Sequence, residues 1–246
     1  MKIDTIGHVR HLINDRPERR NALGAETMRQ LLAALEAAER DAEVKAVVLS
    51  GAPPAFCAGS DLKELGALSI DGMCEHELET ARIARRIGSL SKPVIAAVEG
   101  FALGGGFILA ISCDLVVSAA DARWHLPEVA NGWLPPWGLQ ALLTRVSPAQ
   151  ARRLVWGDVP IDGRRAEALG LVDVLADDGR ALGEALALAE RLAALPAQAV
   201  ASTKRFFAPF TSLDGERLDV LAARYFADDC RGSAAQTTLR KFMVKQ

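Results

Sequence analysis

Short runs of apolar, often branched residues recur along the chain, and each gives way to a turn or a glycine. The runs are residues 8–13, 46–49, 94–98 and 115–117. The first alternates between apolar and polar positions, and the others are continuously apolar. Continuous apolar runs of this length are typical of strands buried on both faces of a parallel sheet. The pattern therefore predicts a buried sheet built from short strands.

Between these runs, apolar residues are spaced three and four positions apart, as on one face of a helix. Residues 27–40 show this clearly, and residues 75–90 also have a helical pattern. Beyond about Ser147 the pattern becomes mainly helical, and only residues 171–175 resemble a strand. The later helices are expected at 148–156, 163–169, 179–195 and 213–228. Alternating strands and helices predict an α/β core, here residues 1–190, followed by a helical C-terminal region, residues 191–246.

Composition narrows the classes of protein that fit this pattern. The chain has 246 residues with 50% hydrophobic and 24% charged side chains, so it can bury a large core and is not a disordered chain. A net charge of -2 gives no basic surface for nucleic acid, and no apolar run is long enough to span a membrane. The four cysteines lack metal-binding spacing, and the N-terminus starts no apolar signal region. We therefore expect a reduced cytoplasmic protein without metal, nucleic-acid or membrane partners.

Two glycine-containing loops, residues 55–62 and 100–106, are the strongest candidates for a ligand site. Each follows a predicted strand and precedes a helix, and ligands of open α/β sheets bind at such strand ends. Three consecutive glycines at 104–106 let a ligand approach the backbone closely. The loops lack the lysine of a P-loop and the spacing of a dinucleotide fingerprint. Taken alone, the glycine run fits an anion site and tight helix–strand packing equally well.

Taken together, the motifs resemble those of one family. They are Arg16-Pro17-Glu18, Arg20-Asn21-Ala22-Leu23, Phe56-Cys57-Ala58-Gly59-Ser60-Asp61-Leu62, Gly100-Phe101-Ala102-Leu103-Gly104-Gly105-Gly106, Cys113-Asp114-Leu115, Pro127-Glu128, and Phe242 with Lys245. Their order along residues 8–245 is similar to that in the crotonase family, which contains the enoyl-CoA hydratases and isomerases. The resemblance covers essentially the whole chain.

The resemblance implies both an architecture and a chemistry. The architecture is the crotonase (ClpP-like) fold, an α/β fold of repeated ββα units with a helical C-terminal trimerisation region, assembled as a homotrimer or a dimer of trimers. The substrate is an acyl-CoA thioester, so coenzyme A enters as part of the substrate and no prosthetic group is implied. The family's oxyanion hole consists of two backbone N–H groups, which by motif match belong to Ala58 and Gly105. Each such donor stabilises a thioester enolate by roughly 3 to 4 kcal/mol.

The resemblance also implies contacts to coenzyme A. Ala22 and the stretch Ser60, Asp61 and Leu62 correspond to the part of the family that lines the adenine pocket. Phe242 and Lys245 correspond to C-terminal residues that reach the nucleotide, often from a neighbouring subunit. A lysine there would neutralise phosphate charge. Two of these residues have simpler alternatives, since Asp61 suits a helix N-cap and Lys245 a solvated chain end.

The departures from the family pattern bear on which reaction is catalysed. A typical family hydratase has two glutamates, but Ile108 occupies the position of the first, and only Glu128 remains. Pro136 also replaces a glycine whose N–H helps orient the water, and proline has no N–H to donate. A single carboxylate against an apolar wall suits proton transfer between two carbons, and burial would raise its pKa toward neutrality. The sequence therefore favours a one-glutamate enoyl-CoA isomerase.

Several alternatives remain open at this point. A hydratase or a decarboxylase would use the same enolate, and a non-catalytic protein that binds CoA thioesters would keep only the fold. RNA binding, found in an unusual family member, is disfavoured by the charge. Among side chains, Cys57, His125 and Glu64 are weaker catalytic candidates, and Glu99 has no evident role. Trp133 and Trp137 suit either the acyl pocket or the core.

Overall fold

The computed structural model describes residues 1–157, 159–212 and 214–243, with the side chains of 210–212 and 243 left undescribed. The strands are β1 (Lys2–Ile6), β2 (Val9–Asn14), β3 (Ala46–Gly51), β4 (Val94–Val98), β5 (Phe101–Leu103), β6 (Leu115–Ala119), β7 (Arg123–His125) and β8 (Val174–Ala176). A 3-10 turn, η1 (Pro17–Arg19), precedes the first helix. The helices are α1 (Ala25–Arg40), α2 (Leu62–Leu65), α3 (Ile70–Ser89), α4 (Gly105–Ile111), α5 (Glu128–Asn131), α6 (Leu139–Arg145), α7 (Pro148–Val155), α8 (Gly163–Leu169), α9 (Ala181–Ala193), α10 (Ala197–Ser212), α11 (Gly215–Cys230) and α12 (Ser233–Met243).

The main sheet has six strands in the order β1-β2-β3-β4-β6-β8, and only β1 runs antiparallel to its neighbour. The predicted parallel pairing of the buried runs is therefore confirmed. All five residues of β4 are buried, as continuous apolar character requires when helices cover both faces. The edge strand β1 escaped prediction because every one of its residues is exposed, which leaves no buried face to mark it.

Strands β5 and β7 form a separate parallel pair and carry the chain toward the candidate site. Both were missed from the sequence because each has only three residues. The predicted strand at 171–175 lies at Val174–Ala176, and the predicted helix at 75–90 begins earlier, at Ile70. Helix α10 was also missed, since its sequence carries Pro209 inside the helix and two exposed phenylalanines, Phe206 and Phe207.

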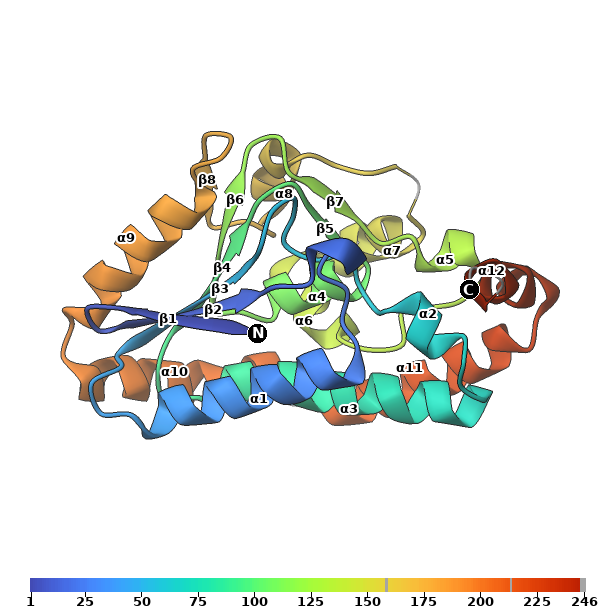
Figure 1. Cartoon of the computed structure of the whole chain (residues 1–246), viewed down its shortest axis with the longest axis horizontal. Coiled ribbons are helices and arrows are strands. Elements are labelled where there is room, and N and C mark those ends of the chain that lie inside the picture. The colour runs from blue at the N-terminus through green and yellow to red at the C-terminus, as the bar shows by residue number, and fades with distance from the viewer. Residues whose placement is uncertain (158, 213, 244–246) are drawn as a thin grey trace.

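Helices pack on the sheet and extend beyond it, as Figure 1 shows. Helix α9 contacts β2, β3, β4, β6 and β8, while α1 contacts β2 and α4 contacts β4 and β6. The C-terminal helices leave the sheet, because α10 and α11 pack on α3 and α6, and α12 packs on α2 and α5 (Figure 1). The predicted division at residue 190 falls inside α9, so the two regions share that helix.

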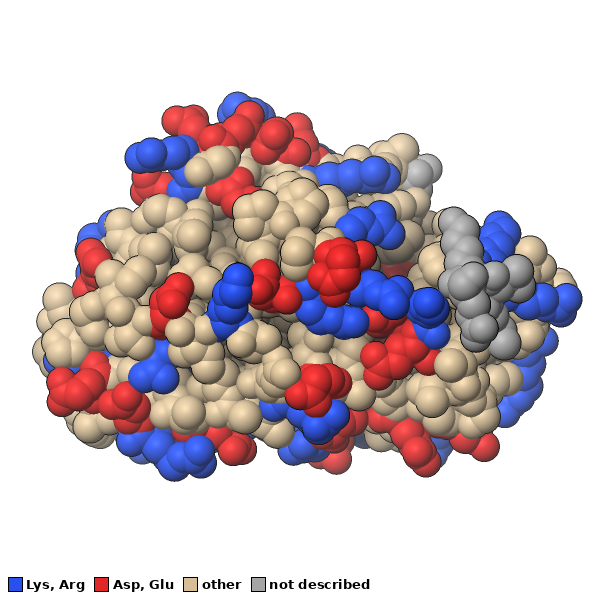
Figure 2. Space-filling model, viewed as in Figure 1, with Lys and Arg blue, Asp and Glu red and all other residues tan. Residues whose placement is uncertain are grey.

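Two hydrophobic clusters hold these layers. The larger fills the space around the sheet, with Leu12, Leu49, Ile95 and Phe107 among its members. A small second cluster joins the C-terminal helices to α2 and α3, and it consists of Leu65, Met73, Trp133, Phe226, Cys230, Ala235 and Leu239. On the face seen in Figure 2, basic and acidic side chains are interspersed. None of the described helices combines the length and apolar character needed to cross a membrane.

Candidate active site

A small pocket of about 60 Å³ lies where both glycine loops meet α3, α5 and α11. Its walls are mostly apolar, but two glutamates open into it. The lining consists of Ala58, Gly59, Ser60, Leu62, Leu65, Glu77, Gly104, Gly105, Ile108, Pro127, Glu128, Asn131, Trp133, Pro135, Pro136, Trp137 and Phe226. The structure thus brings together the loops, Glu128, Ile108, Pro136 and both tryptophans that the sequence singled out.

Two backbone N–H groups face this pocket without an acceptor. Gly105 is the first residue of α4, so its N–H precedes the helical hydrogen bonds, and neither it nor the Ser60 N–H donates to any acceptor within the described ranges. A methyl group built on Gly105 would lie 3.5 Å from the Ser60 nitrogen, which places the two donors side by side. Two neighbouring unpaired donors that line one pocket are the arrangement that an oxyanion hole requires.

This pair corrects one expectation. The sequence predicted Ala58 as the second donor, but the Ala58 N–H donates to the carbonyl of Arg20 at 3.1 Å. The neighbouring N–H groups point elsewhere, because Asp61 N donates to Leu23 O at 2.9 Å and Gly59 N to the Cys57 sulfur at 3.4 Å. Only the Ser60 N–H of this stretch is left for a ligand. Ser60 and Gly105 are therefore the two candidate donors of an oxyanion hole.

Glu128 is one of the two carboxylates that line this pocket. It is the first residue of α5 and is 8% exposed. Its Oε1 lies 2.8 Å from the position that a Cβ on Gly104 would take, and Gly104 has a φ of +52°, so only glycine fits this close approach. Its Oε2 is buried and has no hydrogen-bond partner within the described structure. Burial, reinforced by the charge of Glu77, raises the pKa of Glu128 to about 8.

The raised pKa has a consequence for stability. An unfolded chain releases the Glu128 proton near pH 4.3, whereas the folded protein holds it to about pH 8, so folding loses stability as pH rises through this window. Glutamine mimics the protonated acid, so Glu128→Gln should raise the free energy of unfolding at pH 8 by up to about 5 kcal/mol. The gain should vanish at pH 4. Urea unfolding of both proteins at pH 4, 6 and 8 measures it, and a pH-independent difference would contradict the buried-acid interpretation.

Glu77 is a second carboxylate of the pocket, which the sequence motifs did not indicate. It lies on α3, is 2% exposed, and accepts a hydrogen bond from Trp137 Nε1 at 2.7 Å. Burial raises its pKa, while hydrogen bonds from Ser60 and Trp137 oppose that rise. Glu77 therefore bonds with one of the two residues of the hole and shares the pocket with Glu128. Glu77 occupies a position on the apolar face of the amphipathic helix α3. A charged residue at such a position is the signal in the sequence that could have indicated its burial.

The comparisons with known proteins decide the family. A model described as "Enoyl-CoA hydratase/isomerase" matches residues 8–245. The chain belongs to the enoyl-CoA hydratase/isomerase family. A "Putative enoyl-CoA hydratase" of Thermus thermophilus is 39% identical over 222 residues, covering 88% of each chain. A "Probable enoyl-CoA hydratase" of Rhizobium meliloti is 40% identical over 203 residues, covering 81% of this chain and 78% of the relative.

Solved structures agree with this assignment. The crystal structure of a putative enoyl-CoA hydratase from Mycobacterium avium paratuberculosis superposes with a TM-score of 0.88 at 28% identity, covering 100% of this chain and 98% of that one. The predicted α/β crotonase fold with its helical C-terminal region is confirmed. The protein is an enzyme of the hydratase/isomerase family, which acts on acyl-CoA thioesters without a prosthetic group. Within the described residues, no cluster of three or more metal-ligating side chains is present.

Of the residues predicted to contact coenzyme A, Ser60 and Leu62 line the pocket. The segments of Ala22 and Ser60 run together, since Leu23 bridges Ser60, and Arg16 donates to Ala22 O at 2.9 Å and to Asp61 at 3.1 Å. Asp61 caps α2 by accepting from Lys63 N and Glu64 N, as its alternative interpretation predicted.

The remaining predicted contacts lie on α2 and α12. Leu62 lines the pocket, and Phe242 lies half-buried on α12, which packs on α2. Lys245 is outside the described residues.

The weaker catalytic candidates have structural roles. Burial raises the pKa of Cys57 to about 12, so its thiol stays protonated. His125 Nε2 lies 3.2 Å from Gly157 O, and His125 does not line the pocket. Glu64 accepts from Ala25 N at 3.0 Å at the start of α1. Glu99 accepts from Ala181 N at 2.6 Å and so caps α9, which explains a residue that the sequence left without a role.

Proposed function

We propose that this enzyme moves the double bond of an enoyl-CoA from the β,γ to the α,β position, with Glu128 as its only base. Glu128 removes a proton from the α-carbon, the Ser60 and Gly105 N–H groups stabilise the enolate oxygen, and the same carboxyl returns the proton to the γ-carbon. The observation that carries the proposal is the buried, unpartnered Glu128 Oε2 in the same pocket as two unpaired N–H donors. A pKa of about 8 suits a group that both accepts and returns a proton near neutrality.

The walls of the pocket support isomerisation over addition of water. Ile108 is 1% exposed and occupies the place of the family's first glutamate. Pro136 lines the same pocket and offers no N–H to a water molecule. Glu77 is already bonded to Trp137, and burial favours its neutral form. The geometry therefore leaves one carboxylate free for proton transfer.

Hydration is the second candidate, and Glu77 is the observation that favours it. Two carboxyl groups in one pocket can hold a water molecule between them, and relatives carry hydratase names. Glu77 would then take the place of the family glutamate that Ile108 removes, reaching the pocket from α3 instead of α4. In the hydratase proposal Glu77 must help to hold the water molecule, whereas in the isomerase proposal it takes no part in proton transfer.

A paired absorbance assay distinguishes them. One sample receives a β,γ-enoyl-CoA and the other an α,β-enoyl-CoA, each with the wild type, Glu77→Gln and Glu128→Gln. We expect conjugated thioester to accumulate from the first substrate, with Glu77→Gln within about tenfold of the wild type. Loss of absorbance from the second substrate, abolished by Glu77→Gln, would establish hydration instead. Coenzyme A thioester binding without either reaction would favour decarboxylation or a protein that only binds.

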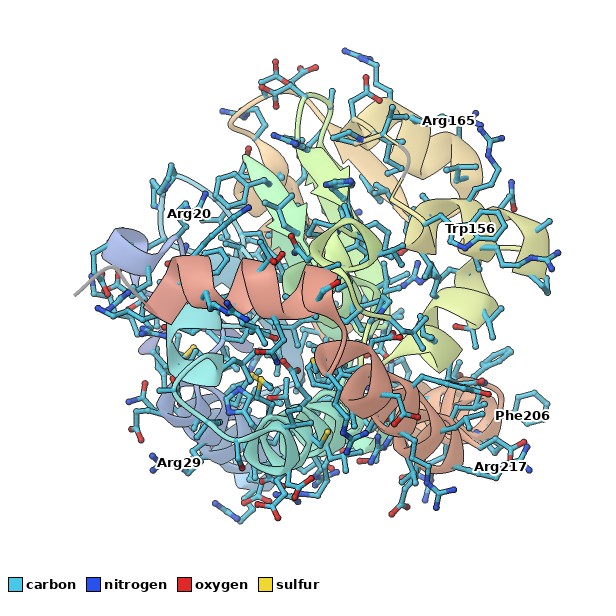
Figure 3. The ribbon with its side chains drawn as sticks, turned by 90° about the vertical axis from the view of Figure 1, so that its right-hand side faces the viewer. Arg20, Arg29, Trp156, Arg165, Phe206 and Arg217 are labelled. Atoms are coloured by element: carbon cyan, nitrogen blue, oxygen red, sulfur yellow. The ribbon has the colours of Figure 1, made fainter. Side chains whose placement is uncertain are left out.

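We also propose that the enzyme assembles as a homotrimer or a dimer of trimers. Large apolar side chains are exposed on its surface, including Trp156 (63%), Val159 (64%) and Phe206 (68%). Figure 3 shows Trp156 and Phe206 toward the same edge of the molecule. Apolar side chains that gather on one edge of a protein are candidates for an interaction surface. Light scattering should give a mass of three or six times 26.3 kDa, and a monomer mass would refute the proposal.

The cytoplasm is the compartment that we propose. All four cysteines are free, and three of them are buried, as expected for a protein kept in a reducing environment. Fractionation of cells that produce the protein tests this.

A further inference from the structure

Trp137 separates the catalytic pocket from a much larger cavity. The catalytic pocket has a volume of about 60 Å³, and the second cavity, of about 810 Å³, lies between α3, α6 and α10. Trp137 lines both. The first volume accommodates only a few atoms, whereas the second is in the range of sites that hold a whole ligand. No other described residue lines both cavities.

The indole of Trp137 lies directly beside the oxyanion hole. Its Cζ2 atom is 3.2 Å from the position that a Cβ on Gly105 would take, and the residue is 2% exposed. A thioester carbonyl held by Ser60 and Gly105 would thus have this ring within contact distance. An acyl chain that continues from the carbonyl toward the cavity meets the indole first.

The ring is held in place from both ends. Its Nε1 donates to Glu77 Oε2 at 2.7 Å. The next residue, Gly138, donates its N–H to Asp219 Oδ1 at 2.8 Å, and Asp219 pairs with Arg85. These contacts tie the indole to α3 and its backbone to α11, so the wall is a fixed part of the site.

The cavity behind Trp137 suits an alkyl chain. Much of its lining is apolar, with small side chains from α3 and branched ones from later helices. These residues include Ala81, Ala84, Ile111, Ala141, Leu192 and Val200. The charged groups that line it are paired with one another, as Arg85–Asp219, Lys204–Asp114 and Arg145–Asp173. Neutralised charges and apolar walls favour a hydrocarbon over an anion.

We propose that Trp137 determines acyl chain length: it restricts the enzyme to short acyl groups, and its removal would join the pocket to a cavity able to hold a long alkyl chain. The inference rests on the proposed acyl-CoA chemistry of this site. It does not depend on whether the reaction is isomerisation or hydration.

Binding of saturated acyl-CoAs tests the inference, because these ligands do not react. Dissociation constants of butanoyl-CoA and dodecanoyl-CoA are measured by calorimetry for the wild type and for Trp137→Ala. Each methylene that becomes buried improves binding by about fourfold, so a few methylenes should shift the ratio of the two constants by at least tenfold toward the long chain. Trp137→Leu, which retains more of the packing, should shift it in the same direction if Trp137→Ala fails to fold.

Three matched variants distinguish the loss of the Trp137 ring from other effects of the substitution. Trp133 lines only the catalytic pocket, so Trp133→Ala should not produce the long-chain shift. Trp137→Phe keeps a ring but loses the bond to Glu77, and should keep the short-chain preference. Adding Ala141→Phe to Trp137→Ala should refill the cavity and reverse the shift.

An unchanged ratio in folded Trp137→Ala, or an equal shift in Trp133→Ala, would overturn the inference alone. Failure of every variant and the wild type to bind any acyl-CoA would overturn the proposed function with it.

Discussion

Replacing Glu128 by glutamine is expected to lower kcat for the β,γ-enoyl-CoA by about 10³-fold, because an amide cannot accept the α-proton. The fold should survive, since glutamine has the same shape and removes a buried charge. KM should change little, because the N–H groups of Ser60 and Gly105 still bind the carbonyl. The kcat of Glu128→Asp should lie between those of the wild type and Glu128→Gln, because aspartate keeps the carboxylate but its side chain is shorter by one methylene.

The pH profile gives a separate measure of the same group. Only ionised Glu128 can accept a proton, and burial raises its pKa to about 8. The kcat/KM of the wild type should therefore rise with pH and level off above about 8. Glu64→Gln is the matched control, because Glu64 caps α1 outside the pocket and an amide oxygen can still accept from Ala25 N. Full activity of Glu128→Gln, or equal losses in Glu64→Gln, would contradict the assignment.

Gly59→Ala is expected to lower kcat by about 10²-fold to 10³-fold through the oxyanion hole, although residue 59 supplies no catalytic group. A Cβ at this position would lie 2.8 Å from Leu103 O and 3.1 Å from the Gly105 nitrogen. The methyl group would obstruct that N–H and push apart the two loops that hold the donors. Steady-state kinetics on the β,γ-enoyl-CoA measure the effect.

The backbone strain of such a substitution needs its own control. Gly59 has a φ of +91°, so alanine there strains the backbone and lowers stability, in addition to its steric clash. Gly179 has a φ of +76° with nothing within 4 Å of its Cβ position, and it lies far from the pocket in sequence. Gly179→Ala suffers the backbone strain without the close contact, so it should lose some stability and retain its kcat. Equal kcat values for the two folded variants would exclude the obstruction of the hole.

The sequence predicted the features that depend on local pattern. Continuous apolar runs located β3, β4 and β6, because strands covered on both faces allow few polar positions. The order of the glycine loops and of Pro127-Glu128 predicted the family. The raised pKa of Glu128 also followed from its apolar neighbours in the motifs.

The features of the site that the sequence did not predict depend on contacts between residues far apart in the chain. A motif match cannot show that the Arg20 carbonyl occupies the Ala58 N–H and leaves Ser60 as the donor. Glu77 lies on a helix far from Glu128 in the sequence, and its place on the apolar face of α3 does not show that it shares a pocket with Glu128 until α3 is docked. The wall formed by Trp137 likewise exists only once α6 and α10 enclose the second cavity.

The small cluster that joins the C-terminal helices to α2 and α3 gives the pocket an outer shell separate from the sheet. Trp133 packs edge-on against Phe226 of α11, and both line the pocket. Seven buried side chains hold this shell, far fewer than hold the sheet, so it can open locally at a lower free energy than global unfolding requires. Local opening of this shell would give a bulky thioester a way into and out of the pocket. Faster amide hydrogen exchange in α12 than in β3 is the signature of such a division, and uniform exchange would refute it.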